Sequence, residues 1–575
     1  MARAAMARAA MARASLDRLR SEWLDRRVDG HWRGRLSTSA LSTATAVSAL
    51  SALTLSAGND ANRRRLIERG MRYLSDAANA DGGFGDTDRS HSNIATTYLV
   101  TAADELSRSA GGPTLAPEMR SAAAAYIQRS GGRRGLRERY GKDRTFVVPI
   151  LTNLAIAGLV PWRDVPQLPF EAAAVPPSWY RRVRMPVVSY AIPALVAIGW
   201  VRHHHRPTRV LPLRMVRNAA TRRTGRVLRA MQPDSGGYLE ATPLTSFVLM
   251  ALASCRRTET AVAADAERFL ADSIREDDGW PIDTDLATWA TSLSITALAS
   301  DPDDDGSWNT PPLRDWLVSC QHRQRHPFTG ADPGGWGWTD LSGAVPDGDD
   351  TPAAILALQH LGDPSGPIAA GRQWLAGLQN RDGGVPTFCR GWGRLPFDRS
   401  SVDLTAHALR SGGIDAAAAV RFIERRQNDD GSWSPLWFGD QDHVDEDNPI
   451  YGTSRVLLAA EHLPGERVRR GVEFLRRSAA NVRGVEMIAL TLDGLLAGGV
   501  AADDPTVDDL LVRLCASIER GDHQRPEPIG FYFAKLWYHE EAYPYVFAMA
   551  ALGRYLSQVN LAEYEDVLGE PNGGA

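Results

Sequence analysis

Apolar residues along this chain recur with helical spacing, in stretches that are rich in alanine and leucine. SFVLMALAS (246–254), TSLSITALAS (291–300) and TAHALRSGG (405–413) are typical, and β-branched runs of the kind that favour strands are few. Residues three and four positions apart share one face of a helix, so this spacing indicates helices that bury one side. The pattern therefore predicts an all-α protein.

Polar turns of a recurrent type separate these helical stretches. Each turn combines Asp and Gly with a position that is usually aromatic, and that position recurs every 42 to 56 residues after Tyr238. Glycine permits the tight turn, and the aromatic ring can pack between neighbouring units. A repeat of this length that holds two helices predicts α/α barrels, which are closed rings of helical hairpins. The turns are NADGGFGD (79–86), QPDSGGY (232–238), REDDGW (275–280), DPGGWGW (332–338), QNRDGGV (379–385) and QNDDGSW (427–433).

Length adds a second expectation, which concerns the number of domains. A chain of 575 residues exceeds what one hydrophobic core usually supports, so two or more domains are expected. Hydrophobic residues make up 43% and charged residues 23%, and the net charge of −4 gives no sign of a nucleic-acid partner.

The cysteines are scattered without a CxxC pair, which fits a reducing cytosol and argues against a zinc site. They are Cys255, Cys320, Cys389 and Cys515.

The N-terminus repeats MARAA and has no acidic residue before Asp17. This resembles a transit peptide in composition, but there is no apolar stretch of the kind that directs secretion. We interpret the segment as a dispensable extension that leads into a short helix, Ser15–Arg26.

One segment, Val175–Pro207, departs from the repeat pattern. Its apolar run, Pro186–Trp200, has 15 residues and two prolines, which is too short to span a bilayer. Basic residues flank the run on both sides, which favours an element that dips into a membrane with headgroup anchors. A buried barrel helix is the alternative, and a metal at the histidine triplet is disfavoured because adjacent residues diverge on a helix. The flanking residues are Arg181, Arg182, Arg184, Arg202, His203–His205 and Arg206.

The candidate chemistry lies in Pro333–Thr351, PGGWGWTDLSGAVPDGDDT, where two tryptophans precede the carboxylates Asp347, Asp349 and Asp350. Crowded like charges raise the pKa of at least one carboxyl, so that it can hold a proton at neutral pH. Aromatic faces attract cations without reacting with them. A strong acid beside an aromatic wall is the combination that carbocation chemistry requires.

An Asp/Gly cluster is more often a solvated turn, and DPDDDG (301–306) and GDQDHVDEDN (439–448) are interpreted as surface loops of that kind. DGDDT differs because it opens an apolar helical run, TPAAILALQHL (351–361). Its carboxylates are therefore expected at a helix N-terminus that faces a packed interior.

Together these motifs resemble the squalene–hopene cyclases and their relatives, the class II terpene cyclases. The resemblance extends from about Gly30 to Tyr555. It rests on PGGWGWTDLSGAVPDGDDT, the QNDDGSW-type turns, VPWRDVPQLP (160–169) with VPPSW (175–179), SVDLTAHAL (401–409), IYGT (450–453) and YPYVFAMAALGRY (543–555).

The resemblance implies two α/α barrels arranged as a dumbbell, with the cavity between them. It implies that residues 1–26 pack on the C-terminal barrel, that 27–265 form an inserted barrel and that 266–575 form the catalytic barrel. It also implies a monotopic protein on the cytoplasmic face of the membrane, with Pro186–Trp200 in the membrane-contact region.

Residue roles follow from the same resemblance. Asp349 occupies the position of the proton donor, Asp347 and Asp350 are its partners, His407 hydrogen-bonds the donor and Asp403 is a supporting acid. A charged imidazole at His407 would stabilise the conjugate base. The residues implied to line the cavity are Trp289, Trp336, Trp338, Phe388, Trp437, Tyr451, Phe531 and Tyr538. Val385, Phe388 and Ala290 depart from the residues usual in the family, which leaves the product open.

The predicted function is a class II cyclase that protonates a linear polyprene, with squalene as the favoured substrate, and that needs neither metal nor redox cofactor. Farnesyl or geranylgeranyl diphosphate is the alternative substrate. It would require Mg²⁺ and basic residues, for which Arg144, Arg181, Arg182 and Arg184 are candidates. A barrel that only binds partners, or one resembling protein prenyltransferases, is a more distant alternative because no zinc-ligand set is apparent. A homodimer is left open.

Overall fold

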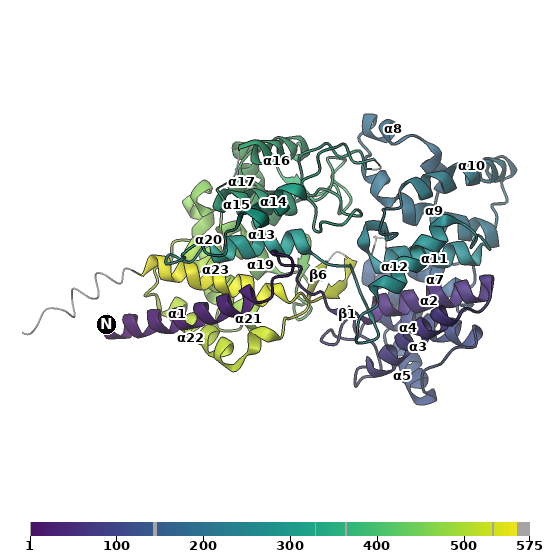
Figure 1. The fold of residues 1–575 in the computed structure, drawn as a ribbon, viewed down its shortest axis with the longest axis horizontal. Helices are drawn as coiled ribbons and strands as arrows, with labels where there is room; N and C mark the ends of the chain where they lie inside the picture. The colour runs from purple at the N-terminus through teal and green to yellow at the C-terminus, as the bar shows by residue number, and fades with distance from the viewer. Residues whose placement is uncertain (1, 142–145, 328, 363–364, 532–533, 560–575) are drawn as a thin grey trace, which may run out of the picture.

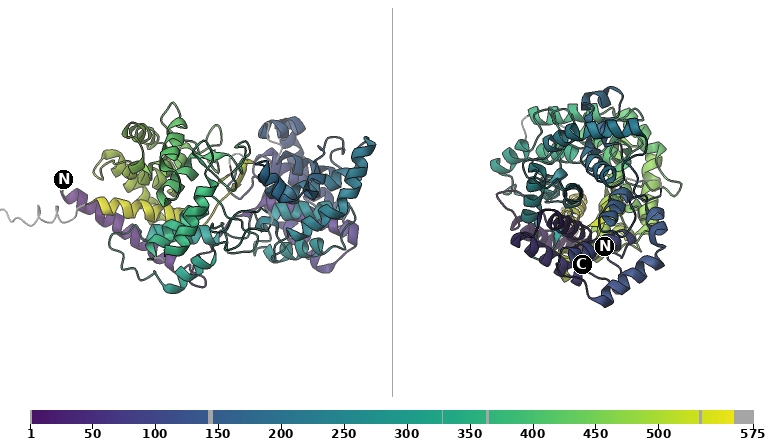
Figure 2. Two further views of the ribbon diagram at one scale, coloured as in Figure 1. Left: turned by 90° about the horizontal axis from the view of Figure 1, so that it is seen from above. Right: turned by 90° about the vertical axis from the view of Figure 1, so that its right-hand side faces the viewer.

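The computed structural model describes residues 2–141, 146–327, 329–362, 365–531 and 534–559, and it consists of two helical bodies placed end to end (Figure 1). Viewed along the long axis, the helices form a ring around a centre (Figure 2, right). The predicted all-α class is confirmed, since the strands are short and lie in turns.

The first body contains α2 to α12. Its helices are α2 (Ala40–Ala57), α3 (Ala61–Asp76), α4 (Ile94–Ser109), α5 (Pro117–Arg129), α6 (Gly132–Tyr140), α7 (Val147–Ile156), α8 (Pro177–Arg182), α9 (Val187–His205), α10 (Leu211–Ala230), α11 (Thr242–Ser254) and α12 (Ala261–Ser273), with the 3₁₀ turns η1 (Phe170–Ala174) and η2 (Tyr238–Glu240).

The second body contains α1 and all helices after α12. They are α1 (Ala2–Leu24), α13 (Ala287–Leu298), α14 (Pro311–Ser319), α15 (Asp350–His360), α16 (Ser365–Leu378), α17 (Val402–Ser411), α18 (Ala416–Arg425), α19 (Pro449–Leu457), α20 (Gly465–Ser478), α21 (Val485–Ala497), α22 (Pro505–Arg520) and α23 (Ala542–Gln558), with η3 (Ala460–His462) and η4 (Asp522–Gln524).

In the described ranges, three small antiparallel sheets join loops to one another. The first joins β1 (Thr38–Ser39) to β2 (Trp280–Pro281), the two places where the chain enters and leaves the first body. The second joins β3 (Val385–Pro386) to β4 (Ser400–Ser401), and the third has the order β5 (Phe438–Gly439), β6 (Ile529–Phe531), β7 (Leu536–Tyr538). The α2–α12 body thus lies between α1 and α13 in the chain, while the boundaries at 26 and 265 stay predictions.

The same set of contacts recurs in several of the repeat turns and stabilises them. Trp280, Trp336 and Trp433 are fully buried, and each indole N–H donates to a backbone carbonyl of a preceding helix, at 2.7, 2.8 and 2.9 Å. A glutamine amide in each of several turns donates both to its own turn and to the next repeat, as Gln379 does at 2.8 and 3.1 Å. Placing Trp336 in the substrate cavity is therefore wrong, because it is one of these repeat-packing residues.

Helix α1 begins at Ala2, much earlier than the predicted Ser15, and it is part of the core. Its buried positions follow helical spacing and lie against α22 and α23. Trp23 stacks on Tyr545 at 5.0 Å between ring centroids. The expectation of a dispensable extension is wrong, because the Ala/Arg repeat supplies part of the buried face. The buried residues are Ala9, Ala12, Leu16, Leu19 and Trp23.

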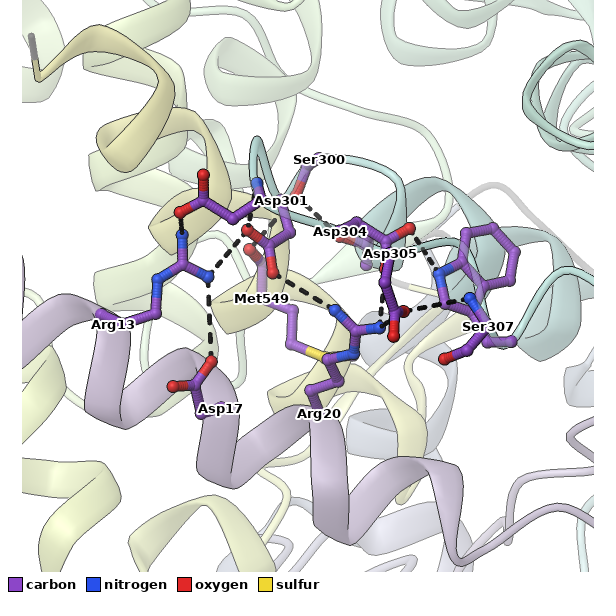
Figure 3. A network of polar contacts seen from close by, with 12 residues as sticks. Arg13, Asp17, Arg20, Ser300, Asp301, Asp304, Asp305, Ser307 and Met549 are labelled. Carbon is purple, nitrogen blue, oxygen red and sulfur yellow. Dashed lines mark hydrogen bonds and ion pairs between the residues drawn. The ribbon is translucent and has the colours of Figure 1, made fainter.

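Both acidic segments interpreted as surface loops are bound by other parts of the chain. Arg13 and Arg20 of α1 reach the loop after α13, where Arg13 donates to Asp301 at 2.8 Å and Arg20 lies 2.7 Å from Asp304 (Figure 3). In the second loop, the Gln441 amide donates to the carbonyl of Arg89 in the first body at 3.0 Å. Both segments are nevertheless surface loops, as predicted, since the side chains of Asp303 and Asp442 are 74% and 75% exposed.

Two apolar helices lie inside the first body. Helix α2 is long and apolar enough to cross a membrane, with a mean hydropathy of 1.4, but 78% of it is buried within the fold. Helix α9, which contains most of Pro186–Trp200, packs against α7, α10 and α11. Val196 and Ile198 are 0% and 1% exposed, so this segment is the buried barrel helix and its assignment as a membrane-dipping element is wrong.

Basic side chains in the last turn of α9 are likewise bound within the protein. The Arg202 side chain donates to the carbonyl of Val165 at 2.8 Å. His203 bonds Asn218 at 2.9 Å, and His205 stacks on Trp162 at 4.4 Å. These side chains therefore do not act as free headgroup anchors.

Candidate active site

The three predicted carboxylates meet at the N-terminus of α15, as the DGDDT pattern indicated. The backbone N–H groups of Asp349 and Asp350 both donate to one oxygen of Asp347, at 2.8 Å each. A carboxylate in this position satisfies donors that the first turn of a helix leaves unpaired. Asp347 thereby fixes the orientation of the two acids that follow it.

Of the three, Asp349 is the one that reaches accessible space. Its side chain is 20% exposed, whereas Asp347 and Asp350 are buried. Burial raises the pKa of Asp347 to about 6, and burial together with the Asp347 charge raises the pKa of Asp350 well above its usual value. The site thus presents one carboxyl group to a ligand and keeps two behind it.

His407 on α17 contacts this carboxyl group directly. Its Nδ1 lies 2.7 Å from Oδ1 of Asp349, and the ring is buried. Burial lowers the pKa of His407, and the hydrogen bond with Asp349 opposes that effect. The expected charged imidazole is therefore not favoured, and we interpret His407 as a neutral ring.

Asp403, in the first turn of α17, belongs to the same acid cluster. It accepts a hydrogen bond from the Ser401 hydroxyl, while its second oxygen, Oδ2, is buried without a partner among the described residues. Burial and then the charge of Asp349 raise the pKa of Asp403 to about 6. This electrostatic influence indicates that Asp403 and Asp349 lie close together.

Aromatic rings lie beside His407, the hydrogen-bond partner of the acid. Trp289 meets His407 edge-on at 6.2 Å, and Phe438 lies 6.5 Å from Trp289 and 4.5 Å from Tyr451. The Trp289 indole donates to the hydroxyl of Tyr543 at 3.2 Å. Tyr538 completes this group, with its hydroxyl 3.1 Å from that of Tyr543.

A second set of rings continues the wall away from the acid. Trp437 lies 4.6 Å from Phe531 and 5.9 Å from Phe388. Phe388 in turn contacts Trp338 at 6.3 Å and Tyr190 of α9 at 5.3 Å. The wall therefore extends from the acid in the second body to a helix of the first body.

Three of these rings were missed by the sequence analysis. Phe438 follows the predicted cavity residue Trp437, and Tyr543 begins the motif YPYVFAMAALGRY. Both therefore lie in motifs that the resemblance had already singled out. Tyr190 lies in the segment that was assigned to the membrane. Its place in the wall depends on contact between the two bodies, which no local pattern shows.

The wall ends at a cavity of about 1810 Å³ between the two bodies. Tyr190 and Phe388 form part of its lining, as do Arg181 and Arg184, whereas Arg182 does not. Arg144 lies outside the described residues. Within the described ranges, no group of three histidine, cysteine or acidic side chains is placed to hold a metal ion.

A helical dumbbell with a buried carboxyl cluster beside an aromatic wall has the architecture of a class II terpene cyclase. The models of the squalene–hopene cyclase N-terminal and C-terminal domains match residues 16–280 and 286–485. The chain belongs to the squalene–hopene cyclase family, a family of terpene cyclases.

The curated relatives have low sequence identity to this chain, and only part of each relative matches it. Sporulenol synthase of Bacillus subtilis is 24% identical over 47% of this chain and 49% of its own. Squalene–hopene cyclase of Alicyclobacillus acidocaldarius is 29% identical over 32% of each chain, and drimenyl diphosphate synthase of Streptomyces showdoensis is 26% identical over 52% of each. The chain thus spans about half or less of these relatives.

Among solved structures, abietadiene synthase from Abies grandis matches with a TM-score of 0.51 and 14% identity, over 90% of this chain and 58% of that one. At this identity the likeness shows the fold alone.

Proposed function

We propose that this protein is a class II cyclase in which Asp349 protonates an alkene of a linear polyprene. The observation that carries the proposal is the hydrogen bond from His407 to Asp349, at 2.7 Å, on the one carboxyl of the cluster that faces accessible space. Because the imidazole engages Oδ1, the other oxygen is left to hold the reactive proton.

The proton moves from Asp349 to the terminal alkene carbon, and the alkene π electrons form the new C–H bond. The resulting tertiary cation is attacked by the next alkene, so each ring closure forms one C–C bond and transfers the charge along the chain. Loss of a proton or addition of water ends the cascade. The Nδ1–H of a neutral His407 stabilises the carboxylate left on Asp349. No step changes an oxidation state, so the proposal needs no redox cofactor.

The aromatic wall supports this role at each later stage. Ring faces stabilise a cation that is removed from water, and contacts of this kind are worth about 2 kcal/mol when desolvated. A fixed wall also folds the polyprene so that successive alkenes are close to one another. Trp289, Tyr451 and Phe438 lie nearest the acid, and Trp437, Phe388 and Trp338 lie farther along.

Squalene remains the substrate favoured by the sequence, and a prenyl diphosphate remains the alternative. The names of the relatives include both a squalene–hopene cyclase and a drimenyl diphosphate synthase. Mg²⁺ enters the proposal only for a diphosphate. The oligomeric state stays a prediction.

Membrane association is a separate part of the proposal, and it is supported by exposed apolar side chains at the rim of the cavity. Trp179 in α8 and Val183 just after it are 64% and 57% exposed, and Trp392 is 56% exposed. The Trp392 indole donates to the carbonyl of Val183 at 3.3 Å, so these residues adjoin. With Leu395 they form what we call the rim patch, which suits insertion into one leaflet on the cytoplasmic side.

The decisive experiment replaces the acid. Purified wild type and Asp349→Asn are incubated with squalene, farnesyl diphosphate and geranylgeranyl diphosphate, with and without EDTA, and products are identified by gas chromatography–mass spectrometry. We expect the variant to lose about 10²–10⁴-fold in rate on the substrate that the wild type cyclises, because general acid catalysis contributes that much.

Asp340→Asn, an exposed carboxylate on the same segment, is the matched control and should keep full activity. Substantial cyclisation by Asp349→Asn, or no cyclisation of any polyprene by the wild type, would overturn the proposal.

A further inference from the structure

The cavity between the two bodies is lined by many basic side chains although it adjoins the aromatic wall. Six arginines of the described ranges line it, and they come from α8, from the segments after α8, α14 and α16, and from the loop after β3. We call this cavity the basic vestibule. The six are Arg181, Arg184, Arg323, Arg381, Arg390 and Arg394.

The part of the chain that the structure describes offers these arginines no anionic partner. Among the described residues, none of the six lies within ion-pair distance of a carboxylate, although such pairs are common elsewhere in the chain. The two acids in the lining are already engaged. Asp332 pairs with Arg325 at 2.5 Å, and Asp382 accepts hydrogen bonds from the Gly384 backbone and the Ser400 hydroxyl.

Uncompensated like charges on a concave surface repel one another and focus a positive potential into the cavity. Arginine binds phosphate oxygens in a planar, two-pronged geometry, and such charge-assisted hydrogen bonds are among the strongest in proteins. A ligand group with several negative oxygens would therefore be held here. One backbone feature agrees with a specialised site, since Arg184 adopts a left-handed conformation with φ of 59°.

The vestibule also meets the aromatic wall. Tyr190 and Phe388 line it, and Phe388 contacts Trp338 and Trp437, which continue toward the acid. A ligand that occupies both regions carries a polyanion at one end and an apolar, alkene-bearing chain behind it. Its far alkene then lies toward Asp349, at the end opposite to the anion.

We infer that the basic vestibule binds the diphosphate of a prenyl diphosphate substrate, with the prenyl chain along the aromatic wall and its terminal alkene at Asp349. This inference rests on the proposed function, and it selects the diphosphate over squalene. The diphosphate is held and not expelled: the proton from Asp349 adds to the far alkene, C–C bonds form within the chain, and the C–O bond to the diphosphate stays intact.

Binding tests the inference apart from turnover. Farnesyl diphosphate, farnesol and inorganic diphosphate are titrated by calorimetry into full-length Asp349→Asn, in which the proposed protonation is blocked. We expect farnesyl diphosphate to bind far more tightly than farnesol, and inorganic diphosphate to compete with it. Adding Arg181→Gln with Arg390→Gln should weaken farnesyl diphosphate about ten- to a hundredfold, because charge-assisted contacts are lost.

The matched control is Arg182→Gln with Arg399→Gln, which removes two exposed arginines from the same two segments that do not line the vestibule. It should leave the affinity unchanged. Equal losses in both double variants would indicate a general charge effect and overturn the inference.

A second arm distinguishes the substrate diphosphate from a lipid headgroup, which offers the same chemistry. Binding to vesicles of phosphatidylglycerol is measured for the same variants. If Arg181→Gln with Arg390→Gln lowers vesicle binding but not affinity for farnesyl diphosphate, these residues are headgroup anchors and the inference falls. If the wild type cyclises squalene through Asp349 and binds farnesyl diphosphate no better than farnesol, the inference falls while the proposed function stands.

Discussion

Trp336 and Trp338 are two residues apart, yet their side chains have different environments. Trp336 is fully buried, and its indole donates to the carbonyl of Leu317. Trp338 is partly exposed and contacts Phe388 in the aromatic wall at 6.3 Å. Residues two apart share one face of a regular extended strand, and this segment forms turns and bends in place of a strand, so the two side chains diverge. One tryptophan therefore serves the fold, and the other faces the chamber.

This difference gives a product-based prediction. Trp338→Leu and Trp437→Leu should each release partly cyclised products, because a cation–π contact worth about 2 kcal/mol is lost at one stage of the cascade. Product profiles by gas chromatography–mass spectrometry test this. Trp336→Leu is the matched control, and it should keep the product while losing about 3 kcal/mol of unfolding free energy. Parent product alone from both wall variants would contradict the assignment.

Asp403 supports a prediction about stability and pH. An aspartate in the unfolded chain titrates near about 3.9, whereas burial and the Asp349 charge raise the folded pKa of Asp403 to about 6. Between these values the folded state binds more protons, so this group lowers the unfolding free energy as pH rises. Asp403→Asn does not titrate. The unfolding free energy of this variant relative to wild type should therefore rise from about pH 4 to about pH 6, by the order of 3 kcal/mol, and then level off.

Thermal unfolding of both proteins between pH 4 and pH 8 measures this difference, and the values near pH 4 are the internal control. A constant difference across the range would mean that Asp403 is not an acid held by burial. The activity of the variant is a separate readout, since Asp403 lies beside Asp349.

At the scale of elements, α1 links the start of the chain to the catalytic body. Leu16 is 1% exposed, and the neighbouring Asp17 side chain is 60% exposed. Leu16→Ala should cost about 2–5 kcal/mol, the usual range for a buried leucine, whereas Asp17→Ala should change stability little. Denaturant unfolding of the two variants tests this, and equal small effects would restore the view of α1 as a dispensable extension.

Sequence patterns predicted some elements better than others, for physical reasons. DGDDT before an apolar run carries both a helix start and a charge cluster, so the N-terminus of α15 was predictable. In α1 the first buried positions are alanines, which are too small to give a clear hydrophobic pattern. The first turns of the helix were therefore not predicted. In α9 a buried helix and a membrane-dipping helix have the same composition, and only the packing around Val196 and Ile198 separates them.

At the scale of the whole molecule, the chamber is built from segments far apart in sequence. Phe438, Phe531 and Tyr538 meet through the β5–β6–β7 sheet, whereas Tyr190 of the other body contacts Phe388 at the far end of the wall. The family resemblance implied several of these rings, but their order along the wall follows from long-range packing. The arginines of the basic vestibule are likewise brought together by long-range packing, since they come from both bodies and share no local motif.

The last prediction concerns how the whole molecule meets a membrane. The rim patch holds its exposed tryptophans beside the opening of the vestibule, so an inserted rim would place that opening at the lipid surface. Trp179→Ser with Trp392→Ser should lower binding to lipid vesicles by about tenfold or more, since each indole removes a large apolar area from water. The unfolding temperature of this double variant should be unchanged.

Ile198→Asp is the contrasting variant. Ile198 is 1% exposed in α9, so a charge at this position should unfold the first body. Co-sedimentation with vesicles and thermal unfolding report the two effects separately. If Ile198→Asp folds normally and only loses vesicle binding, α9 is the membrane element after all, and if the tryptophan pair binds vesicles as well as wild type, the rim patch does not insert.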